Sequence, residues 1–244
     1  GNTKIEYVKW DMNRSICDMY SHIYKGEQSG ECYHRYILGV YDLLERFVQR
    51  FPEILLEGCS GGGGRFDAGM LYYSPQIWCS DNTDAMNRLD IQYGTSFFYP
   101  ISSVGAHVSA CPNHQTGRSV PLSTRADVAL AGSFGYELDL RLLSDEEKAQ
   151  VKEQIKEFYD YYDLTHEGDY YRLTERDNTS FTAWEFVAKN KERALVEVVK
   201  KDAWGNPLPV HVAIKGLEDN SMYVCSLNGI KRSGKTWNHA GITL

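Results

Sequence analysis

The chain is predicted to fold as an α/β domain followed by an antiparallel β domain. Across its first two thirds, short apolar runs alternate with helical patterns, as in parallel strands joined by helices. After about Asp169, strand-like runs follow one another across short, turn-rich gaps, which is typical of antiparallel strands. A hydrophobic content of 42% supplies ample material for a core.

Strands and helices can be placed along the first part in order. Strands are expected at residues 5–8, 54–56, 76–79, 97–99, 105–108 and 134–138. Helices are expected at residues 33–51, stopped by Pro52, at about 83–93 and at 123–130. A further helix begins at the capping box Ser144-Asp145-Glu146-Glu147 and carries apolar residues at helical spacing.

The antiparallel part is predicted from five strand-like runs, at residues 170–173, 181–187, 194–199, 210–214 and 222–225. The preceding α/β part holds about five strand–helix units in about 165 residues, whereas a complete eight-fold barrel takes roughly 250 residues. The residues alone therefore leave two architectures open, an open α/β sheet and the second half of a barrel.

Composition excludes several classes of function. A formal charge of −7 argues against nucleic acid and anionic membrane surfaces as partners. No apolar run is long enough to span a membrane, and residues 1–4 show no signal-peptide core. The six scattered cysteines form no Cys-x-x-Cys pair, so reduced thiols and a cytoplasmic location are expected.

Asp11 ends the first apolar run, in the segment Lys9-Trp10-Asp11-Met12-Asn13-Arg14. Strand alternation sends Lys9 and Asp11 to one face and Trp10 to the other. A neighbouring cation would keep Asp11 ionised, as a nucleophile requires. An aspartate that merely caps the following segment remains the structural alternative.

Asp81 follows another apolar run and precedes a predicted helix, in Ser80-Asp81-Asn82-Thr83-Asp84. Aspartate is a preferred helix N-cap, so either Asp81 or Asp84 fits that purely structural role. The functional interpretation makes Asp81 a general acid, kept protonated by apolar walls such as Trp78. Two carboxylates on one barrel rim are the minimal requirement for cleaving a glycosidic bond.

A glycine-rich run, Cys59-Ser60-Gly61-Gly62-Gly63-Gly64-Arg65, lies between the two aspartates. It lacks the Gly-Lys-Ser/Thr of a phosphate loop and the pattern of a dinucleotide loop, and residues 66–69 are expected to continue it as loop. Consecutive glycines let backbone N–H groups approach a ligand such as a sugar. A flexible surface loop is the alternative.

Histidines offer weaker candidates for function. His107, Cys111 and His114 could be drawn together as a zinc site, but their spacing matches no common zinc motif. A Ser-His-Asp triad lacks its Gly-x-Ser-x-Gly elbow. We expect His107 and His114 to be hydrogen-bonded pocket-wall or core residues, with no metal bound.

Together these segments resemble glycoside hydrolase family 36, the bacterial-type α-galactosidases. The matching stretches are residues 7–14, 57–67, 70–78, 80–85, 99–103, 105–109 and 134–139, and the likeness covers nearly the whole chain. The resemblance implies a retaining mechanism with Asp11 as nucleophile and Asp81 as acid/base. It also implies sugar contacts at Lys9, Asn13, Cys59, Gly62, Arg65 and Trp78.

The same resemblance implies a fold and partners. Residues 1–165 would be the second half of a (β/α)8 barrel, and residues 166–244 a C-terminal antiparallel β-sandwich, truncated at its end. Terminal α-galactosides such as melibiose and raffinose are the implied substrates, and no cofactor is implied. The implied assembly is a homo-oligomer, often a tetramer.

Two departures from the family pattern, Ala68 and Cys79, are tolerable. The serious departure is that the family's N-terminal domain and first barrel strands are absent. An inactive remnant that needs the missing barrel half is therefore one alternative to an active α-galactosidase. A galactosyl-transferring relative of the raffinose-synthase type is another.

Overall fold

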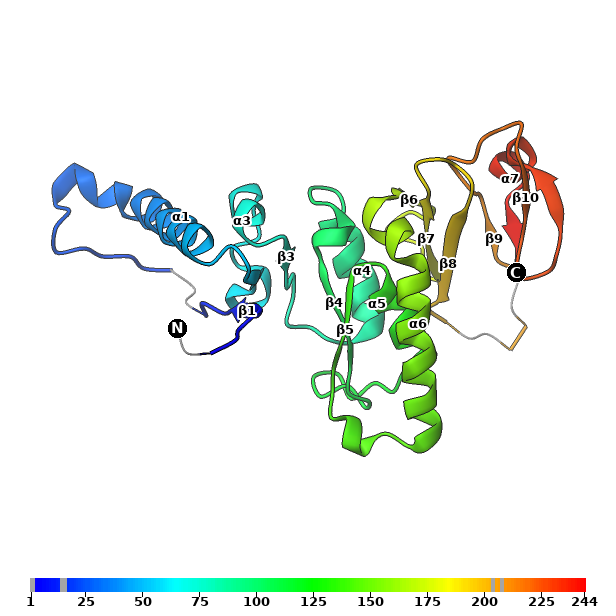
Figure 1. The fold of residues 1–244 in the computed structure, drawn as a ribbon, viewed down its shortest axis with the longest axis horizontal. Coiled ribbons are helices and arrows are strands. Elements are labelled where there is room, and N and C mark those ends of the chain that lie inside the picture. Colours follow the sequence, from blue (N-terminus) through cyan, green and yellow to red (C-terminus); the bar gives the residue numbers. More distant parts are fainter. Residues whose placement is uncertain (1–2, 14–16, 203–204, 207–208) are drawn as a thin grey trace. The chain divides into compact units, whose positions relative to one another are not determined.

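A computed structural model describes residues 3–13, 17–202, 205–206 and 209–244. Arg14, which belongs to the motif around Asp11, lies outside the described residues. The chain divides into two compact units, the first comprising residues 1–81 and 103–105 and the second residues 82–102 and 106–244. Each unit is described by itself, with the elements labelled as in Figure 1.

The first unit is built on a three-stranded parallel sheet whose strand order follows the chain. Its strands are β1 (Tyr7–Trp10), β2 (Leu55–Gly58) and β3 (Gln76–Ile77). A parallel bridge from Ile77 to Val104 continues the sheet beyond β3. The predicted strands at residues 5–8, 54–56 and 76–79 are thus confirmed, with boundaries shifted by at most two residues.

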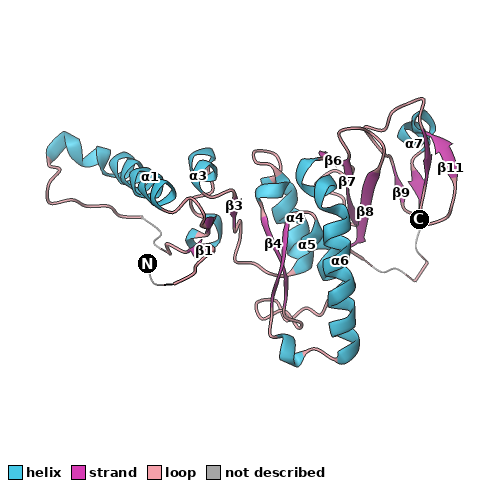
Figure 2. Cartoon of the chain, viewed as in Figure 1, coloured by secondary structure: helices cyan, strands magenta, loops and turns pink. Residues whose placement is uncertain are grey.

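Helices connect these parallel strands, as Figures 1 and 2 show. The connecting elements are η1 (Gly26–Glu31), α1 (Cys32–Arg50), the short turn labelled α2 (Ser60–Gly63) and α3 (Ala68–Tyr73). Helix α1 packs against α3 and buries Val40 and Leu44 with Leu56 and Ile77 in one core. The predicted helix at residues 33–51 is therefore confirmed.

The prediction that residues 66–69 continue the glycine-rich loop was partly wrong, because α3 begins at Ala68. The Asp67 side chain caps the new helix by accepting the Met70 N–H at 2.8 Å. The same carboxylate accepts the hydroxyl of Tyr41, also at 2.8 Å, which ties the helix start to α1. The capping signal was present in the sequence, but the preceding glycines obscured it.

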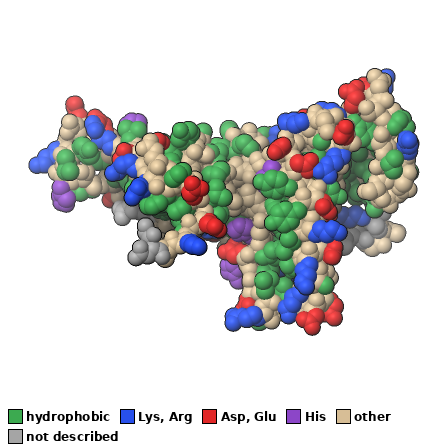
Figure 3. Space-filling model, viewed as in Figure 1, with side chains coloured by type: hydrophobic (Ala, Val, Ile, Leu, Met, Phe, Trp, Pro, Cys, Tyr) green, Lys and Arg blue, Asp and Glu red, His purple; other side chains and the backbone are tan. Residues whose placement is uncertain are grey.

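The second unit begins with helices around a two-stranded sheet. Its elements are α4 (Ala85–Thr95), η2 (Ile101–Ser103), β4 (Gly105–Ser109), α5 (Leu122–Leu130), β5 (Ser133–Glu137), η3 (Leu140–Leu142) and α6 (Asp145–Glu167), except that the last residue of η2 and the first of β4 belong to the first unit. Strands β4 and β5 pair, and Ala106 and Val108 pack with Ala126, Ala129 and Val151 in a common core. The capping box at Ser144 is present, and Figure 3 shows hydrophobic side chains along α6.

The strand predicted at residues 97–99 was wrong. After α4, the N–H groups of Phe98 and Tyr99 both bond to the Thr95 carbonyl, so the backbone continues to turn. Phe97 packs edge-on against Tyr93 of the helix, with ring centroids 5.3 Å apart. Three successive aromatic residues favour a strand, but packing against the helix end overrides that preference.

The rest of the second unit is antiparallel. Strands β6 (Asp169–Arg172), β7 (Phe181–Val187) and β8 (Ala194–Lys200) form one sheet, β9 (His211–Val212) pairs with β12 (Ile242–Thr243), and β10 (Met222–Val224) pairs with β11 (Lys231–Ser233). All five predicted strands are found, two of them shorter than expected. The sequence did not reveal β11, β12 or α7 (Gly234–Ala240).

Over the described ranges, no helix has the length and apolarity needed to cross a membrane.

Candidate active site

The three parallel strands of the first unit end together. Trp10 of β1 pairs with Gly58 of β2, and Gly58 pairs with Ile77 of β3. The next residues along the chain, Asp11, Cys59 and Trp78, therefore leave the sheet at one edge. Backbone hydrogen bonds from Cys59 N to Trp10 O (3.2 Å) and from Trp78 N to Gly58 O (2.8 Å) extend the ladder to that point.

Asp11 lies at this edge surrounded by donors. Gly61 N–H donates to its Oδ1 at 3.2 Å, and Asn13 Nδ2 donates to its Oδ2 at 2.8 Å. The Cys59 thiol and the Ser60 N–H add further hydrogen bonds. These donors stabilise the ionised carboxylate, as a nucleophile requires.

The surroundings of Asp11 and Cys59 determine which of the two side chains carries a proton. Desolvation acts to raise the pKa of Asp11, but the hydrogen bonds from Gly61, Asn13 and Cys59 outweigh it and lower the pKa below its usual value. Burial raises the pKa of the Cys59 thiol, and the neighbouring Asp11 carboxylate adds to that effect. Cys59 therefore remains a protonated donor to an ionised Asp11.

The turn at Ser60–Gly63 owes its shape to left-handed backbone conformations. Its four residues have φ values of 63°, 64°, 74° and 90°, a region that glycine enters without penalty. Ser60 is the one residue of the turn with a side chain, and strain of this kind is typical of functional sites.

Two glycines of this turn lie against the segment that carries Asp81. A Cβ at Gly62 would lie 2.4 Å from the Asp81 nitrogen and 3.1 Å from its Cγ, and one at Gly63 would lie 2.8 Å from the Cys79 carbonyl oxygen. The turn thus contacts Asp11 through Gly61 and Asp81 through Gly62. Adjacent residues of one turn hold the two aspartates on the same side of the first unit.

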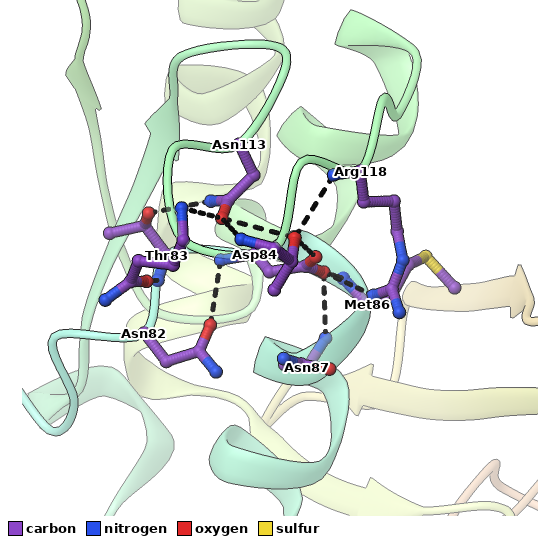
Figure 4. A network of polar contacts seen from close by, with 9 residues as sticks. Asn82, Thr83, Asp84, Met86, Asn87, Asn113 and Arg118 are labelled. Atoms are coloured by element: carbon purple, nitrogen blue, oxygen red, sulfur yellow. Dashed lines mark hydrogen bonds and ion pairs between the residues drawn. The ribbon is translucent and has the colours of Figure 1, made fainter.

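Asp81 is not a helix cap. Helix α4 begins at Ala85, and its N-cap is Asp84, which accepts the N–H groups of Met86 (2.8 Å) and Asn87 (3.2 Å), as Figure 4 shows. Arg118 pairs with the same buried carboxylate at 2.7 Å. This resolves the alternative that the sequence left open and frees the Asp81 carboxylate for another role.

Asp81 contacts Trp78 through a polar group. The indole Nε1–H of Trp78 donates to Asp81 Oδ1 at 3.0 Å. Trp78 was expected to form an apolar wall beside Asp81, but its contact with Asp81 is a hydrogen bond that orients one carboxylate oxygen. Trp78 is itself 3% exposed, so the donor is held in place by packing.

Lys9 does not act on Asp11 as the sequence suggested. Its ammonium group pairs with Oε1 of Glu57 at 3.4 Å and lies 4.7 Å from the ring centroid of Trp78. Hydrogen bonds rather than this cation keep Asp11 ionised. Strand alternation was predicted correctly, since Trp10 packs into the core against Phe47 on the opposite face.

Arg65 is buried beneath the edge. Its Nη1 donates to the carbonyl of Met12 at 2.8 Å, and its Nη2 donates to the hydroxyl of Tyr36 at 3.3 Å. Arg65 thus fastens the chain that follows Asp11 to the end of the glycine-rich turn. These contacts are with the protein's own backbone and with Tyr36, so Arg65 shapes the site from behind.

All eight residues singled out from the sequence lie in the first unit. Sequence reasoning missed Glu57 and Tyr36, which hold Lys9 and Arg65. A charged residue inside the apolar run Ile54-Leu55-Leu56-Glu57 was a signal for the first of these. Tyr36 left no comparable signal in the sequence.

The predicted histidine roles belong to the second unit. His107 Nδ1 lies 3.4 Å from a carboxylate oxygen of Glu137. Within the part of the chain that the structure describes, no cluster of three or more His, Cys, Asp or Glu side chains is arranged to hold a metal ion.

Comparison with known proteins shows the class of protein. Residues 1–168 match the melibiase family model, and residues 181–244 match the model of the glycosyl hydrolase family 36 C-terminal domain. The chain belongs to the melibiase family and is a glycoside hydrolase of family 36.

Particular relatives are similar over nearly the whole chain. The bifunctional α-galactosidase/sucrose kinase AgaSK of Mediterraneibacter gnavus is 55% identical over 99% of this chain. α-Galactosidase AgaA of Geobacillus stearothermophilus is 47% identical over 98% of it. The chain spans 25% and 33% of the lengths of these two relatives.

Solved structures agree with this assignment. The crystal structure of the family 36 α-galactosidase AgaB from Geobacillus stearothermophilus matches with a TM-score of 0.95 at 46% identity. The match covers 100% of this chain and 34% of the AgaB chain. A variant of AgaA in complex with raffinose has the same TM-score, identity and coverage.

Proposed function

We propose that this chain carries the catalytic pair of a retaining α-galactosidase that releases terminal α-D-galactosyl residues from oligosaccharides such as melibiose and raffinose. The observation that carries the proposal is the turn Ser60–Gly63, which contacts Asp11 through Gly61 and Asp81 through Gly62. Two carboxylates held on one side of a site, with different partners, suit the two-step chemistry of retaining glycosidases.

The two aspartates have separate roles in this reaction. Asp11, kept ionised by its donors, attacks the anomeric carbon opposite the leaving group and forms a β-linked galactosyl ester. Asp81 gives its proton to the departing glycosidic oxygen. Asp81 then takes a proton from water as that water attacks the anomeric carbon. The bond between this carbon and the Asp11 oxygen breaks, which releases α-galactose and returns Asp11 to its carboxylate form.

The remaining residues would bind the sugar or shape its subsite. Lys9, with 34% of its side chain exposed, and Asn13 would donate to galactose hydroxyls. Gly62 leaves room beside Asp81, and the Cys59 thiol faces Asp11. Trp78 orients Asp81, while Arg65 acts from behind by holding the Met12 carbonyl.

Similar structures support the assignment of the pair. Variants of AgaA with a substituted aspartate are described in complex with raffinose in one case and stachyose in another. The two substituted aspartates of that enzyme are separated by the same number of positions as Asp11 and Asp81. Raffinose and stachyose are both α-galactosides, which favours this substrate class.

For the architecture, we propose a catalytic portion at residues 1–165 from the second half of a (β/α)8 barrel, and a C-terminal β-sandwich domain at 166–244. The strand order β1-β2-β3, the parallel bridge to Val104 and the extents of the two family models support this division. We further propose that the enzyme works as a homo-oligomer, with a tetramer as the expected state.

Hydrolysis of a chromogenic α-galactoside tests the function, measured on this chain and on the full-length protein. We expect turnover that falls at least 1,000-fold in Asp11→Asn, because covalent catalysis is lost. Asp18→Asn, an exposed aspartate of the same unit, is the matched control and should keep wild-type turnover. Folded full-length protein without turnover would refute the proposal, and transfer products dominating at high acceptor concentration would replace hydrolysis with galactosyl transfer.

A further inference from the structure

Glu57 is a buried acid at the base of the candidate site. It occupies the middle sheet position between Lys9 of β1 and Gln76 of β3, and it is 2% exposed. One carboxylate oxygen pairs with Lys9 Nζ at 3.4 Å, and the other accepts a hydrogen bond from the Tyr7 hydroxyl. Burial raises the pKa of Tyr7, and the hydrogen bond to the Glu57 carboxylate adds to that effect.

The burial of Glu57 constrains Lys9. A buried carboxylate without a cationic partner is strongly destabilising, so the fold favours keeping the Lys9 ammonium group against it. The Trp78 ring, 4.7 Å away, limits the ammonium group from a second side. An ammonium group has three donors, so the contact with Glu57 leaves donors for a ligand on the exposed side of Lys9.

Glu57 also separates two opposite charges. Lys9 and Asp11 lie on the same face of β1, two residues apart, and a mobile ammonium group could pair with the Asp11 carboxylate. Pairing of that kind would occupy the nucleophile with a cation in place of a sugar. The Glu57 contact instead holds Lys9 toward the sheet and toward Trp78.

From these contacts we infer that Glu57 is a positioning residue for galactoside binding, which acts by holding Lys9 where it can donate to the sugar hydroxyls. This inference rests on the proposed function, since it takes Lys9 as a sugar contact. The Glu57 carboxylate is buried and contacts Lys9 and Tyr7. Its effect must therefore pass through Lys9.

A double-mutant cycle in the full-length protein tests this route. We expect Glu57→Gln to lower kcat/KM for an α-galactoside about 10-fold, mostly through KM, and to weaken galactose binding to a similar degree. In a Lys9→Met background, the same Glu57→Gln change should have less than a twofold effect. Glu57→Asp, which keeps the charge but retracts it, should give an intermediate loss even if Glu57→Gln does not fold.

Tyr7→Phe is the matched control, because it removes the other partner of Glu57 and leaves the ion pair with Lys9. We expect it to lower the melting temperature but to keep KM within twofold of wild type. Equal effects of Glu57→Gln with and without Lys9, or a KM for Glu57→Asp equal to wild type, would overturn the inference. Loss of turnover in Asp11→Asn, with galactose binding retained, supports the proposed function separately from this result.

Discussion

Trp78 Nε1 donates a hydrogen bond to Asp81 Oδ1 over 3.0 Å, from a ring that is 3% exposed. This contact joins the residue after β3 to the aspartate three positions later. It fixes one oxygen of Asp81, a residue that is itself exposed. A general acid benefits from such orientation, because proton transfer requires close and aligned partners.

Trp78→Phe removes this donor and keeps an aromatic ring beneath Lys9. We expect kcat to fall roughly 10-fold, about the value of one hydrogen bond to a charged group. The loss should be larger for melibiose than for a nitrophenyl galactoside, since a poor leaving group depends more on protonation. Trp10→Phe, which alters the core face of β1, serves as control, and an equal loss in both variants would argue against the orienting role.

Gly62→Ala tests the contact between the turn and Asp81. The added Cβ would lie 2.4 Å from the Asp81 backbone nitrogen, so the aspartate or the turn must move. We expect at least a 100-fold loss of kcat/KM, because misplacing a catalytic group by about 1 Å can have an effect of that size. Gly117→Ala is matched, with φ of 70° against 74° and open space around its Cβ. It should lose stability, by about 1 kcal/mol, and retain activity.

The Cys59 thiol is predicted to set part of the acid limb of the pH–rate profile. It donates to Asp11 and helps to lower the pKa of that carboxyl. Cys59→Ala removes the donor, so the pKa of Asp11 should rise and the acid limb of kcat/KM should move to higher pH. Cys59→Ser keeps a donor and should stay closer to wild type. An acid limb unchanged in Cys59→Ala would show that this hydrogen bond does not influence Asp11.

Glu185 is expected to make stability depend on pH. It is fully buried in β7, and burial raises its pKa to about 7, although the Lys215 N–H donates to it at 2.9 Å. The folded state therefore binds this proton more tightly than the unfolded state. The resulting stability is fully present below the unfolded pKa and is lost as the pH rises through about 7.

Glu185→Gln should therefore flatten the fall in unfolding free energy between pH 5 and pH 8, by an amount on the order of 3 kcal/mol. Chemical denaturation of wild type and variant across this range measures the difference. Glu192→Gln removes an exposed charge from the turn between β7 and β8 and should keep the wild-type slope. Parallel slopes for wild type and Glu185→Gln would contradict the expectation.

Much of the site was predictable from the sequence because parallel strands end at one edge. Asp11, Cys59 and Trp78 each follow an apolar run, and the register brings all three to that edge. Local patterns could not decide between Asp81 and Asp84 as the helix cap, since both are aspartates close to the start of α4. Only the backbone shows that the helix begins at Ala85.

Contacts that depend on side-chain direction were harder to predict. The sequence suggested that Lys9 would act on Asp11, whereas the buried Glu57 on the neighbouring strand takes its charge. Trp78 was expected to contribute an apolar surface, but its N–H turned out to face Asp81. The neighbouring strand in one case and the ring orientation in the other decide these contacts, and neither is encoded in local spacing.

The roles of the two aspartates are tested most directly by azide rescue of cavity variants in the full-length protein, with the products identified by NMR. In Asp11→Gly, azide should replace the nucleophile on the face opposite the leaving group and yield β-galactosyl azide. In Asp81→Gly, an activated galactoside should still form the ester on Asp11, and azide should displace it to yield α-galactosyl azide. The opposite pair of products, or rescue of neither variant by azide, would contradict the assignment of Asp11 as nucleophile and Asp81 as acid/base.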